Sequence, residues 1–441
     1  MLSSRAKVMQ QLAGRPLISY VISAARALLQ SKEGQITVVT GYGHSQVQSI
    51  AIDSGCNVVH QEEQLGTGHA LEVALRSINP VGTTLVLYGD VPLINKDHLL
   101  PLMENSSKGL AVLVAQVDDP SGYGRILRDK DGQLVAIVEH KDASITQRQI
   151  CEINSGIYSA PTELFKTLLP KLKNTNSQGE YYLTDCVELC VSNGWPVSTV
   201  AGPSHVTLGV NDQQQLTLLN SIVQQELREN LLRAGVHMLD PNSVYIAGDV
   251  SVGSDVVIEP NVFLKGQVKL GDQVVIGYGC YLKDCRVNNG AVIKPYSVIE
   301  SAIIGSEAQV GPFSRLRPGT KMADQSCVGN FCEVKNADIG KGSKVNHLSY
   351  LGDSSLGEST NLGAGTITCN YDGANKNTTI IGNNVFVGSN TSLVAPITLE
   401  DGATVGAGSV VTKDVGTDEL VIARAKQEHI TGYKRPKKSK G

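Results

Sequence analysis

The sequence of 441 residues predicts an α/β Rossmann-like domain followed by a left-handed parallel β-helix of hexapeptide repeats. Short apolar runs alternate with helical periods up to about residue 210, and an aliphatic residue recurs at every sixth position in the second half. The composition agrees with this division. Only 5% of residues are aromatic while 45 are Gly, which disfavours one large globular core.

Residues 1–210 carry the α/β pattern. The runs "QITVVTGYG", "TTLVLYGDVPLI" and "KGLAVLVAQV" are β-rich and include or end in Gly or Asp, which is typical of buried parallel strands. Between them, "PLISYVISAARALLQ" and "GTGHALEVALRSI" have a period near 3.6. This alternation predicts a doubly wound sheet with its ligands at the carboxyl ends of the strands.

Residues 211–235 are predicted to form a linker helix, because the segment is leucine-rich with a polar face and a Gly just past its end. The predicted β-helix domain then covers residues 236–441, including a basic tail. Its period of six fits neither an α-helix nor a hairpin, but it fits a coil with three flat faces and inward aliphatic residues. The first of these residues are Ile246, Val252, Ile258, Leu264, Leu270, Ile276 and Leu282.

Charge and cysteine content limit the class of protein. The net charge of −4 gives no general attraction to nucleic acid, and no apolar stretch approaches the length of a membrane span. The nine cysteines form no C-x-x-C pair, and Met1 is not followed by a signal peptide. These features predict a soluble, cytoplasmic protein with free thiols and no membrane insertion.

Two stretches of the first domain suggest phosphate chemistry. Asp90 follows a strand, where a carboxylate can hold Mg²⁺ that bridges substrate phosphates, although a plain turn aspartate is equally compatible with the position. Gly66, Thr67 and Gly68 precede a helical period, so their backbone can approach an anion at the helix amino terminus. Together the two stretches predict a nucleotide or sugar-phosphate pocket.

The β-helix contains a second cluster of polar side chains. "FSRLRPGT", "GNFCEVKNADIGKGSKVNHLSYLGD" and "LGAGTITCNYDGANK" interrupt the repeat and bring in Arg317, Lys335, His347 and Tyr350. A lone histidine is more often structural than catalytic. One set among basic residues can serve as a general base near neutral pH.

The chain as a whole resembles the bacterial family of bifunctional UDP-N-acetylglucosamine pyrophosphorylases and glucosamine-1-phosphate N-acetyltransferases. The motifs that carry the resemblance are "EQLGTGHA", "LYGDVPL", "PSGYGRI", "IVEHKDA", "QGEYYLTD", "GPFSRLRPG", "HLSYLGD" and "GAGTITCNYDGANK". The resemblance implies acetylation of glucosamine 1-phosphate by acetyl-CoA, then uridylylation of N-acetylglucosamine 1-phosphate by UTP with release of pyrophosphate. It further implies a homotrimer with acetyl-transfer sites between neighbouring β-helices, supplying peptidoglycan and lipopolysaccharide synthesis.

The resemblance also implies roles for single residues of the first domain. Asp90 and Asn211 are expected to hold Mg²⁺. The expected nucleotide-sugar contacts, which include these two, are Lys7, Gln61, Gly66, Thr67, Tyr88, Gly89, Asp90, Gly124, Glu139, Asn154 and Asn211.

In the second domain, the resemblance implies that His347 is the catalytic base, and we expect Glu333 to orient it. The expected sugar-phosphate contacts are Arg317, Lys335, Tyr350 and Asn361. The expected acetyl-CoA contacts are Ala364, Asn370, Tyr371, Ser389, Ala407 and Arg424, with Lys434 and Arg435 of the tail near the CoA phosphates.

The chain departs from the family pattern at its start. Members carry a strand and a loop of the form L-x-x-G-x-G-T-R-M before a Pro-Lys pair, whereas here Met1 aligns with the last loop residue and Ala6 replaces the proline. We therefore expect the first domain to lack its first strand and phosphate loop. Three hypotheses follow: an enzyme with both activities and a misassigned start, an acetyltransferase with impaired uridylyl transfer, and a non-catalytic hexapeptide scaffold.

Overall fold

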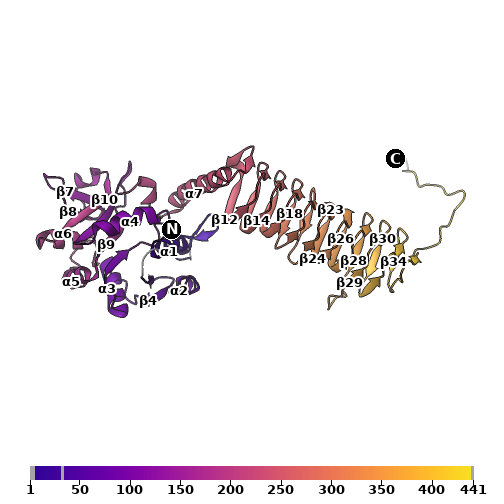
Figure 1. Cartoon of the computed structure of the whole chain (residues 1–441), viewed down its shortest axis with the longest axis horizontal. Helices are drawn as coiled ribbons and strands as arrows, with labels where there is room; N and C mark the ends of the chain where they lie inside the picture. The colour runs from indigo at the N-terminus through magenta and orange to yellow at the C-terminus, as the bar shows by residue number, and fades with distance from the viewer. Residues whose placement is uncertain (1–4, 31–33, 439–441) are drawn as a thin grey trace. The chain divides into compact units, whose positions relative to one another are not determined.

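The computed structural model describes residues 5–30 and 34–438 and divides into two compact units, Met1–Val223 and Gln224–Gly441. The first unit is an α/β domain and the second is a β-helix (Figure 1). The expected end of the phosphate loop at Met1 lies outside the described residues. No described helix is long and apolar enough to cross a membrane.

The α/β unit is built on a six-stranded sheet with the order β10-β6-β9-β7-β8, and β5 pairs with the other part of β9. Two short strand pairs complete the unit: β3 with β4, and the hairpin β1–β2. The strands are β1 (Gln11–Leu12), β2 (Arg15–Pro16), β3 (Thr37–Thr40), β4 (Asn57–His60), β5 (Thr83–Val86), β6 (Leu110–Gln116), β7 (Arg125–Arg128), β8 (Leu134–Val138), β9 (Glu152–Pro161) and β10 (Val197–Ala201).

The sheet differs from a purely parallel one because an antiparallel strand, β9, lies between the predicted strands β5 and β6. β3 runs parallel to β4 and β6 parallel to β10, but β5 and β6 both lie antiparallel to β9. β8 and β9 are both antiparallel to β7 and lie on either side of it. β9 therefore runs opposite to β5, β6 and β7. An apolar strand buried on both faces has the same composition whichever way it runs.

Helices cover both faces of this sheet, which explains why β6 is apolar throughout. Leu110 and Val112 pack with α3, α5 and α6, whereas Ala111 and Leu113 pack with α1 and α4. The helices are α1 (Leu17–Leu29), α2 (His44–Asp53), α3 (Thr67–Ile78), α4 (Lys96–Asn105), α5 (Thr162–Leu168) and α6 (Asp185–Ser192). Short 3₁₀ turns are η1 (Lys7–Met9), η2 (Gln147–Gln149), η3 (Leu169–Lys171), η4 (Ser204–Val206) and, in the second unit, η5 (Pro241–Ser243).

The predicted linker helix is α7 (Gln213–Arg233), and the boundary between the two units falls inside it. Within the second unit, the Gln224 side chain donates to the Ile246 carbonyl (2.6 Å) and accepts from the Ile246 amide (2.9 Å). Leu231 joins the apolar core of the β-helix. The second half of α7 therefore caps the first coil, whose backbone groups would otherwise lack partners.

The β-helix consists of an eleven-stranded and a fourteen-stranded parallel sheet. The first contains β11 (His237–Met238), β13 (Val257–Ile258), β15 (Val275–Ile276), β17 (Val292–Ile293), β20 (Gln309–Val310), β23 (Cys327–Asn330), β25 (Lys344–His347), β27 (Asn361–Leu362), β30 (Phe386–Val387), β33 (Thr404–Val405) and β35 (Leu420–Val421). The second contains β12 (Tyr245–Val252), β14 (Phe263–Leu270), β16 (Tyr281–Val287), β18 (Val298–Glu300), β19 (Ile303–Ile304), β21 (Arg315–Leu316), β22 (Lys321–Met322), β24 (Glu333–Ile339), β26 (Tyr350–Leu356), β28 (Ile367–Cys369), β29 (Thr379–Ile381), β31 (Ser392–Val394), β32 (Ile397–Leu399) and β34 (Val410–Val411).

The period of six becomes a stack of aliphatic side chains inside the coil. Ile258 stacks on Ile276 and Leu264 on Leu282, in each case three hexapeptides further along the chain. These four side chains are fully buried in one continuous core. Each residue of a coil therefore belongs to a column, and its neighbours in that column lie one strand spacing away.

We expect the core position of a coil to dominate its stability. Ile276→Ala removes a fully buried side chain and is expected to cost about 2–5 kcal/mol of unfolding free energy, because neighbouring coils cannot close the cavity. Val275→Ala, on the outward side of the same strand, is expected to cost below about 1 kcal/mol. Urea denaturation followed by circular dichroism measures both, and equal losses would contradict the inward assignment.

Candidate functional sites

The loop after β5 brings one cation together with two oxygen-bearing side chains. The Asp90 carboxylate forms an ion pair with the Lys7 ammonium, and Lys7 Nζ also donates a 2.7 Å hydrogen bond to Asn211 Oδ1. Carboxylate and amide oxygens are ligand types that Mg²⁺ takes from proteins. Since no group of three or more His, Cys, Asp or Glu among residues 5–30 and 34–438 could hold a metal, an ion here would keep water or phosphate oxygens as further ligands.

The start of α3 is fixed against the segment that contains "EYYLTD". At Gly66, where φ is 108°, an added Cβ would lie 2.7 Å from the Tyr181 carbonyl oxygen, so only glycine fits. That carbonyl accepts a 2.8 Å hydrogen bond from the Gly68 amide, and Thr67 Oγ1 accepts one of 3.0 Å from the Leu183 amide. The amino terminus of α3 is thus held rigidly at the site.

Gln61 joins this cluster from the end of β4. Its side chain is 8% exposed, and Nε2 donates to the Gly66 carbonyl (3.2 Å) while lying 3.0 Å from His69 Nδ1. A buried amide held from one side can present its oxygen to a ligand with a defined orientation.

Tyr88 and Gly89 form the floor beside Asp90. A Cβ at Gly156 would lie 2.6 Å from the Tyr88 ring, and one at Gly89 would lie 2.9 Å from Ile18 Cδ1. Burial raises the pKa of the Tyr88 phenol, against the effect of a hydrogen bond with Thr67. The phenol is therefore a neutral hydrogen-bonding group at the site.

Gly124, Asn154 and Glu139 lie close together: Gly124 precedes β7, Glu139 follows β8 and Asn154 belongs to β9. The Gly124 carbonyl accepts a 2.9 Å hydrogen bond from the Asn154 amide, and a Cβ at Gly124 would lie 3.5 Å from Glu139 Oε1. Burial raises the pKa of Glu139, and the nearby Asp142 and Asp185 carboxylates reinforce the shift. The structure thus groups the predicted residues of the first unit into neighbouring sets.

In the β-helix, His347 stands at the end of β25 with an exposed side chain. Its Nδ1 lies 2.9 Å from Asn330 Oδ1, which aligns with it on the preceding coil. An amide oxygen can only accept, so Nδ1 carries the proton and Nε2 is left with a free lone pair. The expectation that Glu333 orients His347 is wrong, because Glu333 pairs with Arg317 at 2.9 Å.

The predicted sugar-phosphate residues lie on two sheets. Arg317 and Lys335 directly follow or continue paired positions of β21 and β24, so they lie one coil apart. Gly352 of β26 aligns with Lys335 in the following coil, and the Tyr350 hydroxyl of the same strand lies over Gly352. Asn361 belongs instead to β27 of the eleven-stranded sheet. The structure brings the first three together and leaves Asn361 on another face.

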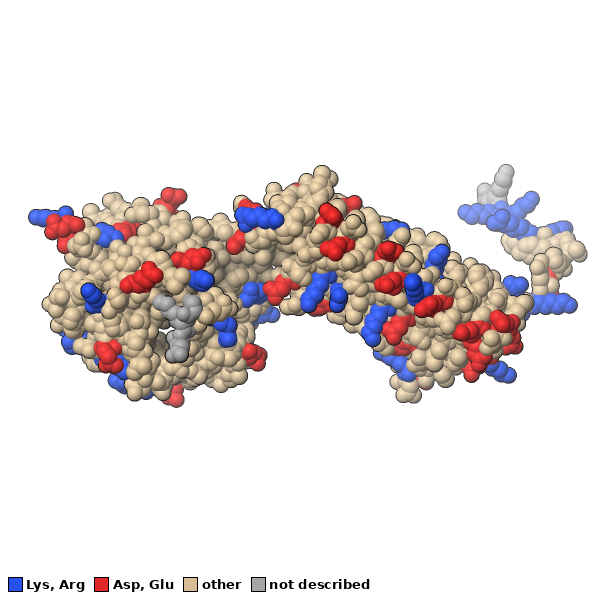
Figure 2. Space-filling model, in the orientation of Figure 1, with Lys and Arg blue, Asp and Glu red and all other residues tan. Residues whose placement is uncertain are grey.

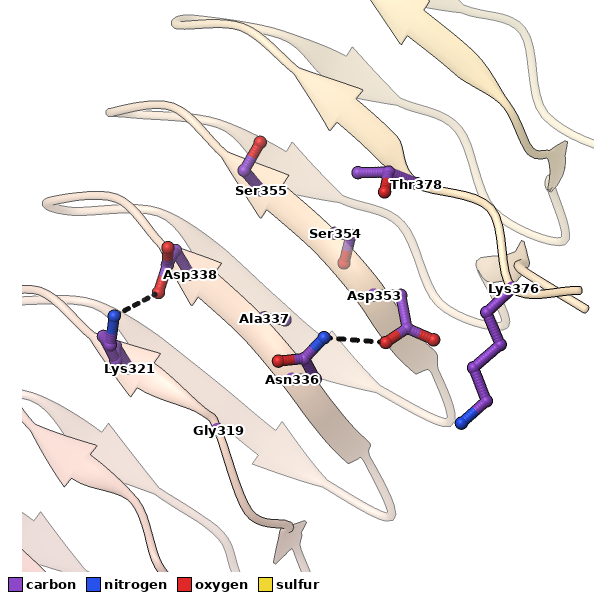
Figure 3. Close-up of a pocket in the computed structure, with 10 residues that line it drawn as sticks. All are labelled: Gly319, Lys321, Asn336, Ala337, Asp338, Asp353, Ser354, Ser355, Lys376 and Thr378. Carbon is purple, nitrogen blue, oxygen red and sulfur yellow. Dashed lines mark hydrogen bonds and ion pairs between the residues drawn. The ribbon is translucent and has the colours of Figure 1, made fainter.

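Lys376 was missed by the sequence interpretation. Hydrogen bonding with Lys335 and the charge of that side chain lower the pKa of Lys376, so the two ammonium groups are neighbours. Figure 3 shows the Lys376 side chain extending from the 370–378 segment beside Asp353, and both residues line a polar cavity of about 480 Å³. The sequence feature that could have indicated a role for Lys376 is that the 370–378 segment interrupts the six-residue period.

The predicted acetyl-CoA residues extend the column of His347. Ala364, Ser389 and Ala407 follow aligned positions of β27, β30 and β33, and His347 is one coil before Ala364. Arg424 Nη1 donates to the Ala407 carbonyl at 2.8 Å. Three of these positions are small residues in line with His347, and this column of Ala364, Ser389 and Ala407 is called the track below.

The remaining predicted acetyl-CoA contacts lie outside this column. Asn370 Nδ2 donates to Asp353 Oδ2 at 2.5 Å, and the Tyr371 ring is 62% exposed. Lys434 and Arg435 lie in an exposed tail, away from the coils. Figure 2 shows basic and acidic side chains interspersed over the β-helix face in view, with no continuous basic stripe there.

Comparisons with known proteins agree with both units. Residues 2–172 match the MobA-like NTP transferase domain family, 242–325 the GMPPB C-terminal domain, and 378–413 the hexapeptide repeat of succinyl-transferase.

Relatives cover the whole chain. The bifunctional protein GlmU of Acinetobacter baumannii (strain AYE) is 48% identical over 442 residues, which is 100% of this chain and 96% of that protein. GlmU of Acinetobacter baylyi is 47% identical over 98% of this chain and 95% of that protein. GlmU of Marinobacter nauticus is 47% identical over 100% and 96%. The chain therefore belongs to the family of bifunctional GlmU proteins.

Proposed function

We propose that the β-helix acetylates glucosamine 1-phosphate with acetyl-CoA, and that the α/β unit then joins N-acetylglucosamine 1-phosphate to UTP with release of pyrophosphate. The observation that carries the first activity is His347, whose Nε2 lone pair is freed by the Asn330 hydrogen bond at the head of a track of small residues. A non-catalytic scaffold has no use for this arrangement, and family membership favours an enzyme.

In acetyl transfer, the neutral amine of the sugar attacks the thioester carbonyl carbon while His347 Nε2 takes its proton. The C–S bond then breaks, and the departing sulfur of CoA receives a proton as the amide forms. The track of Ala364, Ser389 and Ala407 accommodates the CoA arm beside this base. Asn370, Tyr371 and Arg424 border the track, and Lys434 and Arg435 are available to the CoA phosphates.

The phosphate of the amino sugar is held by permanent cations. Arg317, Lys335 and Lys376 supply positive charge on neighbouring coils, and the lowered pKa of Lys376 indicates a repulsion that a phosphate dianion relieves. Tyr350 adds a hydroxyl on the same side.

In uridylyl transfer, a phosphate oxygen of N-acetylglucosamine 1-phosphate attacks the α-phosphorus of UTP and the bond to pyrophosphate breaks. Asp90 and Asn211 are suited to hold Mg²⁺, which when bound neutralises phosphate charge. Lys7 and the start of α3 at Gly66 and Thr67 offer further positive potential to the phosphates.

The rest of the nucleotide-sugar pocket selects the substrates. Gln61 presents a fixed amide to the base, and Tyr88 and Gly89 form the floor. Gly124, Glu139 and Asn154 are proposed to face the sugar. Gly124 has no side chain, which leaves the space beside the Glu139 carboxyl open to this part of the substrate.

The β-helix is proposed to form a homotrimer through an aromatic ladder, which comprises Tyr296, Phe313 and Phe331. Their rings stack at centroid distances of 5.1 and 5.4 Å and are 49–56% exposed. All three have positive φ (55–60°), an unfavourable conformation for bulky residues that costs of order 1 kcal/mol each. Leu348 continues the ladder directly after His347, so a partner seated there also reaches the catalytic track.

Lys7 is expected to compete with the metal ion. Lys7→Met removes the ammonium between Asp90 and Asn211, so we expect Mn²⁺ to bind about tenfold more tightly in the absence of nucleotide. Electron paramagnetic resonance of free Mn²⁺ measures this affinity. Lys7→Arg keeps the charge and serves as the control. Unchanged or weaker binding by Lys7→Met would show that the ammonium does not occupy the ion's place.

The acetyl-transfer assignment predicts a separation of the two activities. His347→Ala is expected to abolish CoA thiol release with glucosamine 1-phosphate, and Asn330→Ala to lower kcat about tenfold because the imidazole loses its orientation. Both variants should retain the Mg²⁺-dependent pyrophosphate release of the parent chain.

The matched control is Gln325→Ala, which removes a 2.8 Å hydrogen bond to Glu307 elsewhere on the β-helix. Full thiol release by His347→Ala would overturn the assignment of the base. Absence of pyrophosphate release in the parent chain would overturn the second activity and support the acetyltransferase-only hypothesis.

The aromatic ladder predicts an effect on assembly. Phe313→Lys places a charge in the proposed contact and is expected to convert a trimer to a monomer in size-exclusion chromatography with light scattering. Acetyl transfer should fall with it. Ile303→Lys, at an outward position that is 44% exposed, is the control and should remain trimeric. A trimeric Phe313→Lys protein would rule out the ladder as the contact.

A further inference from the structure

Arg125 is a buried cation for which neither activity accounts. It lies in β7, its side chain is 1% exposed, and none of the ion pairs among the described residues includes it. Burial lowers the pKa of its guanidinium. The Asp119 and Glu139 carboxylates favour its charge from beyond ion-pair distance. Burying an arginine without a carboxylate in direct contact is costly, so the contacts that it makes instead indicate what it does.

The guanidinium joins three points of the chain. Nη1 donates to the Tyr123 carbonyl, whereas Nη2 donates to the Arg148 carbonyl (3.3 Å) and to His140 Nδ1 (3.2 Å). Since guanidinium groups only donate, His140 accepts through Nδ1 and its ring proton is on Nε2. Arg125 thus ties β7 to both ends of the connection between β8 and β9.

That connection, residues 139–151, also contacts residues 177–182 through Lys141 and Asp142, and its last carbonyl, that of Cys151, accepts from the Val117 amide. Its internal hydrogen bonds are local turns such as Arg148 N to the Ser144 carbonyl. Asp142 fixes its first half by accepting from the Ser177 amide at 3.0 Å. Arg125 supplies the anchor on the side of β7, close to Glu139.

We propose that Arg125 is a positioning residue for the sugar half of the nucleotide-sugar pocket. Gly124 precedes it on the strand and faces Glu139 Oε1, while Glu139 precedes His140 on the connection. The Arg125–His140 bond therefore sets the distance between the two walls that face the sugar. This inference rests on the proposed uridylyl transfer and adds a residue that does not itself touch substrate.

The requirement is for a guanidinium and not simply for positive charge. A lysine ammonium has one nitrogen and cannot reach the Tyr123 carbonyl, the Arg148 carbonyl and the His140 ring with the same planar geometry. Arg125→Lys is therefore expected to loosen the connection while keeping the charge, and His140→Ala to remove one of its attachment points without burying anything new.

Steady-state kinetics of uridylyl transfer test the catalytic part of the proposal. In Arg125→Lys and His140→Ala, the KM for N-acetylglucosamine 1-phosphate is expected to rise about tenfold, while kcat and the KM for UTP change little. Acetyl transfer by the same preparations reports that the rest of the chain is folded. The control is Arg128→Lys, because Arg128 also projects from β7 but pairs with Glu152 of β9 at 2.5 Å.

Limited proteolysis tests the same inference without any activity. The connection is largely exposed, so trypsin is expected to cleave after Arg148 several-fold faster in the two variants than in the parent chain or Arg128→Lys. Unchanged cleavage would overturn the anchoring role. Faster cleavage with an unchanged KM for the sugar phosphate would overturn the role in the pocket. If the parent chain releases no pyrophosphate but the two variants are still cleaved faster than the parent, the proposed uridylyl transfer is wrong and the anchoring role of Arg125 is retained.

Discussion

The backbone hydrogen bonds between coils are the constraint on which the acetyl-transfer half depends. Each coil must place an aliphatic side chain inward at every sixth position and donate its amides to the next coil, as at Ile258 and Ile276. Residues that are distant in sequence then become neighbours in a column about 4.8 Å apart. Asn330, His347 and Ala364 form such a column, so the proposed base, the amide that contacts it and the first residue of the proposed acetyl-CoA track follow from one register.

The α/β unit arranges its residues by a different means. Its predicted site residues come from loops and strand ends, and glycines allow those backbones to approach, as Gly66 does against Tyr181. Burial there shifts the pKa of ionisable side chains, as it raises the pKa of Glu139. Because no repeating register fixes these loops, each needs its own anchors, and a buried residue such as Arg125 can matter without touching a substrate.

The sequence predicted the β-helix in more detail than the α/β sheet because a period of six has one structural solution. An apolar strand such as "LAVLVAQ" does not indicate which strand lies beside it, so the antiparallel β9 between β5 and β6 was not predicted. The same distinction applies to the sites. The sequence predicted Arg317, Lys335 and His347 because they interrupt a strict pattern. It did not predict that Asn330 contacts His347, because choosing between Asn330 and Glu333 as that partner requires the register of neighbouring coils. Lys376 lies in an insertion for which the repeat predicts no position.

The two proposed sites differ in the groups that would hold a phosphate, and the chemistry of each proposed reaction accounts for the difference. Acetyl transfer leaves the phosphate unchanged, so permanent cations such as the proposed ligands Arg317 and Lys335 would bind it at no later cost to the reaction. Uridylyl transfer instead moves negative charge onto departing pyrophosphate, which requires positive charge that responds during the step. Lys7 contacts both Asp90 and Asn211, and a metal ion held by these two residues, as proposed, would leave the Lys7 ammonium available to the phosphates. The compact pair of oxygens in the α/β unit and the fixed cations of the β-helix are thus each suited to one of the two reactions.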